Sequence, residues 1–91
     1  MPVAMMIENP NVNQEIYDKV RAAIGLEAPA GGIVHIAGPG PTGGWRVIEV
    51  WESEDDAQRF LRERLFPAFQ QVGVEPPPTP PQFWQVHNIM Q

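Results

Sequence analysis

The stretch Trp45–Trp51, WRVIEVW, decides how the rest of the chain is interpreted. It combines β-branched and aromatic residues, which favour a strand. Ser53 follows almost at once, and Asp56 comes three residues later, which is the spacing of a helix start capped by a serine side chain. The sequence therefore predicts a strand that leads directly into a helix.

Two segments have the apolar spacing of amphipathic helices. In the helix after the capping serine, the apolar residues are Ala57, Phe60, Leu61, Leu65, Ala68 and Phe69. Because Pro67 lacks an amide hydrogen and clashes with the preceding turn, we expect it to kink or end this helix. The other pattern spans residues 12–24, where Asn11 or Asn13 can cap the start and Gly25 the end.

Three further segments are predicted strands, at residues 2–7, 32–37 and 82–90. The glycine- and proline-rich residues 38–44 favour a hairpin loop, and the proline-rich residues 75–81 favour an extended connector. The complete order is β-α-β-β-α-β, which is that of the ferredoxin-like plait. Because such crossovers are right-handed, we expect an α+β fold with both helices on one face of a four-stranded antiparallel sheet.

Both faces of the predicted sheet are largely apolar. Along the strand at 45–51, Ile48 and Val50 point to one side, and Val47 and Trp51 point to the other. An antiparallel sheet with one wet face normally has a polar side, and none of these strands supplies one. An open apolar face would exceed the patch that a soluble monomer tolerates. We therefore expect a homodimer in which two sheets stack, a dimeric α/β barrel.

The composition bounds the class of protein. Ninety-one residues suffice for a single domain, over residues 1–91. The balance of 11 acidic against 6 basic residues, net -5, argues against a nucleic-acid partner. No apolar run approaches the roughly 20 residues of a membrane span, so we expect no membrane partner and a cytoplasmic protein. The absence of cysteine excludes disulfides and thiolate metal sites.

A set of residues spread over nearly the whole chain carries a family resemblance. It consists of the stretch 44–53 (GWRVIEVWES), Phe60, Leu65, Pro67, Tyr17 and the stretch 86–88 (VHN). With these residues the chain resembles small members of the dimeric α+β barrel superfamily, similar to antibiotic biosynthesis monooxygenase domains. The resemblance implies a plait that dimerises through its sheets and encloses a cavity. Members include cofactor-free oxygenases of polyketide quinols, lactone isomerases, cyclases and haem enzymes, so no shared catalytic set is implied.

Three residues are candidates for acid–base chemistry: His35, Glu49 and His87. We place their faces on the side away from the helices, because the residues that alternate with them form the cleaner apolar set for helix packing. On that assignment they converge, together with Gln85, on one concave region lined by aromatic residues. A carboxylate beside a histidine in an apolar cavity is typical of a general base, because burial and the partner tune both groups.

The same region is expected to bind a flat compound through aromatic walls. The predicted substrate-binding residues are Tyr17, Trp45, Trp51, Phe83 and Gln85. A structural interpretation stays open, because histidines and tryptophans in strands also serve as packing or interface residues. In that case Glu49 pairs with Arg46 or with the other chain.

Two functions fit these residues. One is a small cofactor-independent enzyme, of monooxygenase, isomerase or cyclase type, acting on a hydrophobic, aromatic or enolisable, polyketide-like compound. Each of these reactions begins with deprotonation of a phenol or enol. The other is a non-catalytic ligand-binding or stress-associated dimer. Two histidines and a carboxylate match the ligand types of a metal facial triad without its spacing, and both histidines lie in strands, which disfavours haem; no cofactor or metal is expected.

Overall fold

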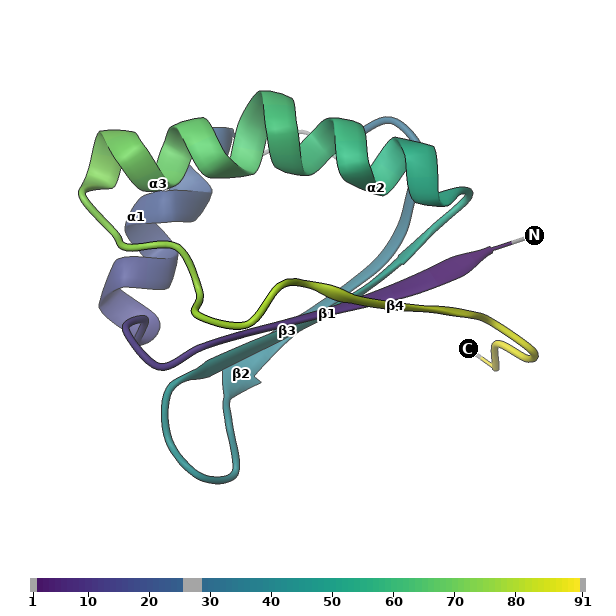
Figure 1. Ribbon diagram of the computed structural model, residues 1–91, viewed down its shortest axis with the longest axis horizontal. Coiled ribbons are helices and arrows are strands. Elements are labelled where there is room, and N and C mark those ends of the chain that lie inside the picture. The colour runs from purple at the N-terminus through teal and green to yellow at the C-terminus, as the bar shows by residue number, and fades with distance from the viewer. Residues whose placement is uncertain (1, 26–28, 91) are drawn as a thin grey trace.

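A sheet forms one layer of the molecule and helices form the other (Figure 1). The computed structural model describes residues 2–25 and 29–90. Within them, four antiparallel strands lie in the order β2-β3-β1-β4, so that β3 and β1 are central. The strands are β1 (Val3–Asn9), β2 (Gly32–Pro39), β3 (Trp45–Trp51) and β4 (Gln82–Gln85). The predicted α+β class, with a four-stranded antiparallel sheet, is confirmed.

The first helix, α1 (Gln14–Ile24), begins after Asn13, one of the two predicted caps, two residues later than the predicted pattern, and it ends at the predicted Gly25. The Asn13 side chain accepts a hydrogen bond from the Ile16 amide at 2.9 Å, and Gly25 follows the last turn with a φ of 100°. Val20 on its apolar face packs against α3, and the Arg64 guanidinium donates to the Ile24 carbonyl oxygen at 2.7 Å. These contacts fix α1 against the second helix.

The second helix runs without a break through α2 (Glu54–Phe60), η1 (Leu61–Leu65) and α3 (Phe66–Val72). Ser53 caps its start by accepting from the Asp56 amide at 3.2 Å. The helix does not end at Pro67, because the π-helical turn η1 places this proline in the first turn of α3. A proline inside an α-helix removes a hydrogen bond and clashes with the preceding turn, and here that preceding turn is π-helical. No helix in the described part of the chain is long and apolar enough to cross a membrane.

The sheet face that the helices cover is the opposite of the one expected. Met5, Ile7 and Trp51 pack against the second helix in the main core cluster. Strand alternation therefore turns Trp45, Val47 and Glu49 toward the helices as well. Counting apolar residues favoured the alternate set, but the large Trp51 side chain, only 1% exposed, fills the space under the second helix.

The last strand is shorter than predicted and ends at Gln85 instead of residue 90. β4 pairs only with β1, and their register places Gln85 opposite Val3, the first residue of β1. One further backbone bond, from the Val86 amide to the Pro2 carbonyl oxygen at 3.0 Å, closes the pairing. Because β1 offers no more partners, residues 86–90 continue outside the sheet.

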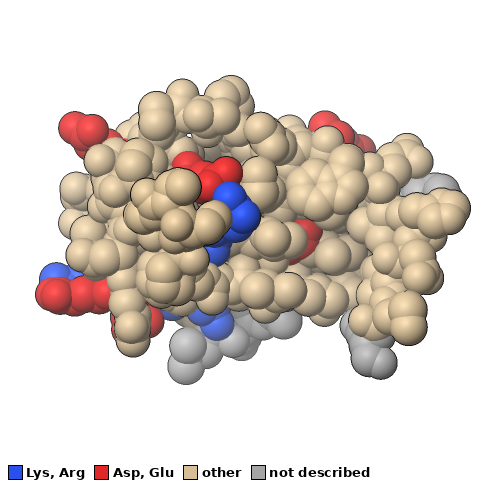
Figure 2. All heavy atoms as spheres, turned by 90° about the horizontal axis from the view of Figure 1, so that it is seen from below, with Lys and Arg blue, Asp and Glu red and all other residues tan. Residues whose placement is uncertain are grey.

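We call the sheet face without helices the open face. Its apolar residues are Ala4, Met6, Val34, Ile36, Ile48, Val50 and Trp84. Ile36 is 59% exposed and Trp84 is 47% exposed. Figure 2 looks onto this side of the molecule and shows a largely uncharged surface. The predicted absence of a polar face is therefore confirmed for the open side of the sheet.

Candidate functional site

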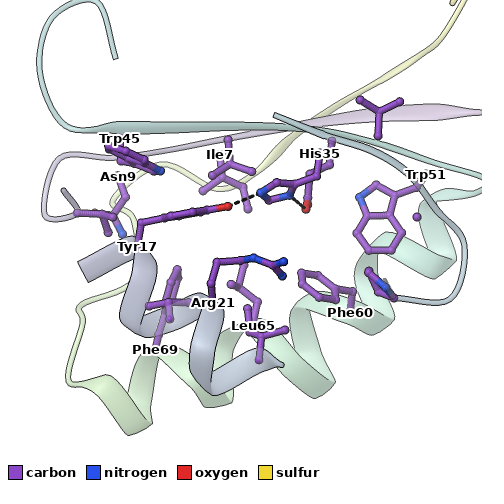
Figure 3. A pocket seen from close by; sticks show the side chains of 18 of the residues that line it. Ile7, Asn9, Tyr17, Arg21, His35, Trp45, Trp51, Phe60, Leu65 and Phe69 are labelled. Atoms are coloured by element: carbon purple, nitrogen blue, oxygen red, sulfur yellow. Dashed lines mark hydrogen bonds and ion pairs between the residues drawn. The ribbon is translucent and has the colours of Figure 1, made fainter. Parts of the chain in front are cut away.

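A cavity of about 270 Å³ lies between the sheet and the helices (Figure 3). Its walls come from α1, the second helix, and the covered sides of β1, β2 and β3. Among the residues that line it are Tyr17, Arg21, His35, Trp45, Glu49, Trp51, Phe60 and Leu65. The volume is slightly below the roughly 300–1,000 Å³ usual for ligand sites. The cavity therefore suits a small compound.

Three polar side chains form a hydrogen-bonded series along one wall of the cavity. β2 and β3 pair His35 directly with Glu49, and the His35 Nδ1 to Glu49 Oε2 distance is 2.6 Å. On the other side of the ring, His35 Nε2 lies 2.6 Å from the Tyr17 hydroxyl oxygen. Because an ionised carboxylate can only accept, His35 donates a hydrogen bond from Nδ1–H to Glu49, which leaves Nε2 to accept one from the Tyr17 hydroxyl. The arrangement thus fixes one histidine tautomer.

The series leads from the interior toward solvent. The Glu49 side chain is 8% exposed, whereas the His35 side chain is 40% exposed. A buried carboxylate needs a hydrogen-bonding partner to offset its lost hydration, and His35 provides one. The imidazole is therefore hydrogen-bonded at both nitrogens and remains partly exposed.

Tyr17 holds its proton more tightly than a free tyrosine. Burial raises the pKa of Tyr17 above its usual 10.0, and the negative charges of Glu49 and Asp18 add to the rise, while the Arg21 guanidinium lowers it. The ring packs against Trp45, with centroids 5.3 Å apart, and stacks on His35. Tyr17 is therefore a hydrogen-bond donor at neutral pH.

The structure brings five of the predicted site residues together. Around the cavity lie Tyr17, His35, Trp45, Glu49 and Trp51. Glu49 does not pair with Arg46, whose guanidinium instead contacts Glu8 on the open face at 2.9 Å. The predicted pairing of a histidine with this carboxylate is therefore present, although on the covered face of the sheet and not on the open one.

The other three predicted residues do not line this cavity. Phe83 packs against the main core cluster, and Gln85 is exposed at the end of β4. His87 is exposed beyond that strand. Because β2 and β4 are opposite edges of the sheet, about 14 Å apart at the usual strand spacing, the predicted convergence of His35 with Gln85 and His87 does not occur within the described chain.

Two features of the cavity escaped the sequence analysis. Arg21 was not among the predicted site residues, yet it lines the cavity. The signal was its position four residues after Tyr17, which places both on one helix face. The indole nitrogens of Trp45 and Trp51 are buried without a hydrogen-bond partner among the described residues. The same residues include no group of three His, Asp or Glu side chains arranged to hold a metal ion.

Comparisons with known proteins support the fold and name no activity. No protein-family model matches the chain, and no curated protein does. Among solved structures, Rv0793 from Mycobacterium tuberculosis is similar with a TM-score of 0.59 and 17% identity, covering 100% of this chain and 98% of that one. NE2512, a protein of unknown function from Nitrosomonas europaea, has a TM-score of 0.58 and 17% identity, covering 99% and 89%.

Proposed function

We propose that the cavity binds a small, flat, aromatic or enolisable compound and that His35 removes a proton from it without a cofactor. The observation that carries this proposal is the Glu49–His35–Tyr17 series facing an otherwise apolar cavity. Glu49 holds the ring in the tautomer whose Nε2 accepts a proton, and it stabilises the imidazolium that forms. Deprotonation of a phenol or enol is the first step of cofactor-free oxygenation, isomerisation and cyclisation alike.

The Tyr17 hydroxyl is proposed to relay the proton. It already donates to His35 Nε2, so a ligand hydroxyl bound beside it passes its proton to the Tyr17 oxygen as Tyr17 gives its own to His35. No free phenolate accumulates on Tyr17, in keeping with its raised pKa. The relay lets His35 act on a ligand without displacing the tyrosine.

The size of the cavity limits the ligand. An apolar protein cavity of about 150 Å³ holds one benzene, and the cavity here is about 270 Å³. One ring or two fused rings therefore fit. Trp45, Trp51 and Phe60 supply flat surfaces for such a compound.

We also propose that the chain adopts the ferredoxin-like plait and forms a homodimer through its open face, as in the dimeric α+β barrel superfamily that it resembles. Two cross-sheet rows support this proposal. One row contains Val34, Val50, Ala4 and Trp84, and the next contains Ile36, Ile48 and Met6. Covering them with a second copy removes apolar surface from water, while the Arg46–Glu8 ion pair marks the polar end of this face.

A second candidate function is ligand binding without catalysis. The observation that favours it is that Tyr17 already satisfies His35 Nε2, so the three side chains can serve as a closed structural network. The two functions differ in whether a bound compound loses a proton.

Exchange of hydrogen for deuterium separates the two functions without knowledge of the later reaction steps. One- and two-ring 1,3-diketones, which exist largely as enols, are incubated with the protein in heavy water. Removal of the enol O–H proton gives an enolate that takes up deuterium at carbon, and the loss of that C–H signal is followed by NMR. We expect His35→Ala to slow the catalysed exchange by about 10²–10⁴-fold. His87→Ala, which alters the chain's other histidine outside the cavity, should leave the rate unchanged. Binding of the ketones without exchange would favour the non-catalytic function.

A further inference from the structure

Arg21 brings a positive charge to the cavity opposite the histidine. In Figure 3 its guanidinium extends beneath the Tyr17–His35 pair toward the middle of the pocket. Among residues 2–25 and 29–90, its side chain makes one hydrogen bond, from Nη1 to the Gly25 carbonyl oxygen at 3.4 Å. A guanidinium has five N–H donors, so this single long bond leaves donors for a ligand in the cavity.

Trp51 provides a neutral donor at the same cavity. Its side chain is 1% exposed, and its indole nitrogen has no hydrogen-bond partner within the described chain. Figure 3 shows this nitrogen on the side of the ring that faces the pocket. A buried donor without a partner costs free energy, and a ligand oxygen in the cavity would remove that cost.

The charges around the cavity favour a neutral ligand that becomes an anion there. Glu49 and Arg21 carry opposite charges and balance each other. When a neutral hydroxyl compound gives its proton to His35, a cation and an anion appear together, and the net charge stays the same. A carboxylate would instead bring an uncompensated negative charge into a mostly apolar cavity beside Glu49, which is costly.

We propose that Arg21 and the indole N–H of Trp51 form an oxyanion subsite, which holds the deprotonated oxygen of a neutral phenol or enol. This inference rests on the proposed role of His35 as the base. The ligand O–H bond breaks, its electron pair stays on the ligand oxygen, and the proton passes through the Tyr17 hydroxyl to His35 Nε2. The subsite thereby selects weakly acidic hydroxyl compounds over carboxylic acids.

Binding of 4-nitrophenol tests the subsite, because the phenolate absorbs visible light and the phenol does not. At a pH where the free compound is mostly neutral, wild-type protein should bind it largely as phenolate. We expect Arg21→Gln to lower the ratio of bound phenolate to bound phenol by at least about tenfold and Trp51→Phe to lower it severalfold. Arg21→Lys should fall between wild type and Arg21→Gln, and benzoate should compete at least about tenfold more weakly than 4-nitrophenol.

Trp84→Phe is the matched control, since it removes an indole N–H that lies on the open face of the sheet and outside the cavity; the ratio should not change. Unchanged phenolate in both Arg21→Gln and Trp51→Phe, tighter binding of benzoate, or no bound phenolate in wild type would overturn the subsite. His35→Gln tests the role of His35 as the base separately from the subsite. Loss of phenolate in the arginine and tryptophan variants but not in His35→Gln would retain the subsite and reject His35 as the base.

Discussion

Each face of the sheet departs in part from its usual polarity. An antiparallel sheet normally turns apolar residues toward its helices and polar residues toward water. Here the covered face contains Asn9, Glu49 and His35, while the open face is lined with aliphatic residues and Trp84. These departures are the basis of the two proposals, a reactive cavity under the helices and an association surface on the open face.

The covered face itself contains two kinds of polar residue. Asn9 is buried, and both ends of its side-chain amide bond the backbone: its Nδ2 donates to the Glu75 carbonyl oxygen at 3.2 Å and its Oδ1 accepts from the Asn11 amide at 3.0 Å. Glu49, in contrast, holds a histidine that faces empty volume. A closed network supports the fold, whereas a network that ends at a cavity can act on a ligand.

The largest expected effect is at the open face. Ile48 lies in its centre, opposite both Ile36 and Met6. Ile48→Glu would place an unpaired charge in the proposed interface, at a cost of about 3 kcal/mol or more. That corresponds to a dimer dissociation constant raised by at least about 100-fold. Analytical ultracentrifugation over a concentration series measures this change.

The control for this experiment is Gln58→Glu, which adds the same charge at an exposed position of α2 and should leave the sedimentation coefficient unaltered. If Ile48→Glu also sediments as wild type at every concentration, the open face is not the dimer interface.

A moderate effect is expected at the carboxylate under the helices. Removal of the Glu49 carboxylate also removes the cost of burying its charge, and the neutral His35 that remains can be solvated because it is partly exposed. Glu49→Leu should therefore leave the free energy of unfolding within about 1 kcal/mol of wild type or raise it, while proton exchange is lost. Urea denaturation followed by tryptophan fluorescence gives the stability.

Glu49→Gln is the companion variant, since it keeps the shape and a hydrogen-bond acceptor but removes the charge. A loss of more than about 3 kcal/mol in Glu49→Leu would instead assign the carboxylate to the support of the fold.

The smallest effect concerns Tyr17, the only tyrosine in the chain. Because burial raises its pKa in the folded state, tyrosinate absorbance should rise at higher pH in native protein than in urea. The folded state then holds this proton more tightly. The contribution of Tyr17 to stability is therefore complete below the unfolded pKa of about 10 and is lost as the pH rises through the native pKa.

Two variants test how neighbouring charges shift the pKa of Tyr17. Removing the negative charge in Glu49→Gln should lower the native pKa of Tyr17, and removing the positive charge in Arg21→Gln should raise it. Equal titrations in native and denatured protein would contradict the buried, donating hydroxyl.

The sequence contained the elements and their order, because strand and helix periodicities and capping residues such as Asn13 and Ser53 are local signals. It did not contain the side of the sheet that the helices cover. Alternation tells which residues share a face, but when both faces are apolar only packing decides between them, and here Trp51 decides it. The end of β4 likewise depends on its register with β1 and not on the strand propensity of residues 86–90.

The candidate site likewise combines residues that local signals predicted with residues that only the tertiary structure places. His35 and Glu49 were predictable as neighbours because a hairpin pairs them, and Tyr17 because it lies on the inner stripe of α1. His87 has a similar sequence context, but it follows the strand at the other edge of the sheet. A charged residue such as Arg21 is normally expected on the solvent-exposed face of a helix. Its position four residues after Tyr17, however, indicated the face of α1 that lines the cavity.

The three tryptophans allow both faces of the sheet to be observed in one NMR spectrum. Trp45 and Trp51 line the cavity, and Trp84 lies on the open face. Their indole N–H signals are resolved by NMR and assigned with single Trp→Phe variants. Addition of 4-nitrophenol should move the Trp45 and Trp51 signals and leave that of Trp84 in place, whereas dilution should move Trp84 alone. A ligand shift confined to Trp84, with both cavity signals unmoved, would contradict a binding site on the covered face.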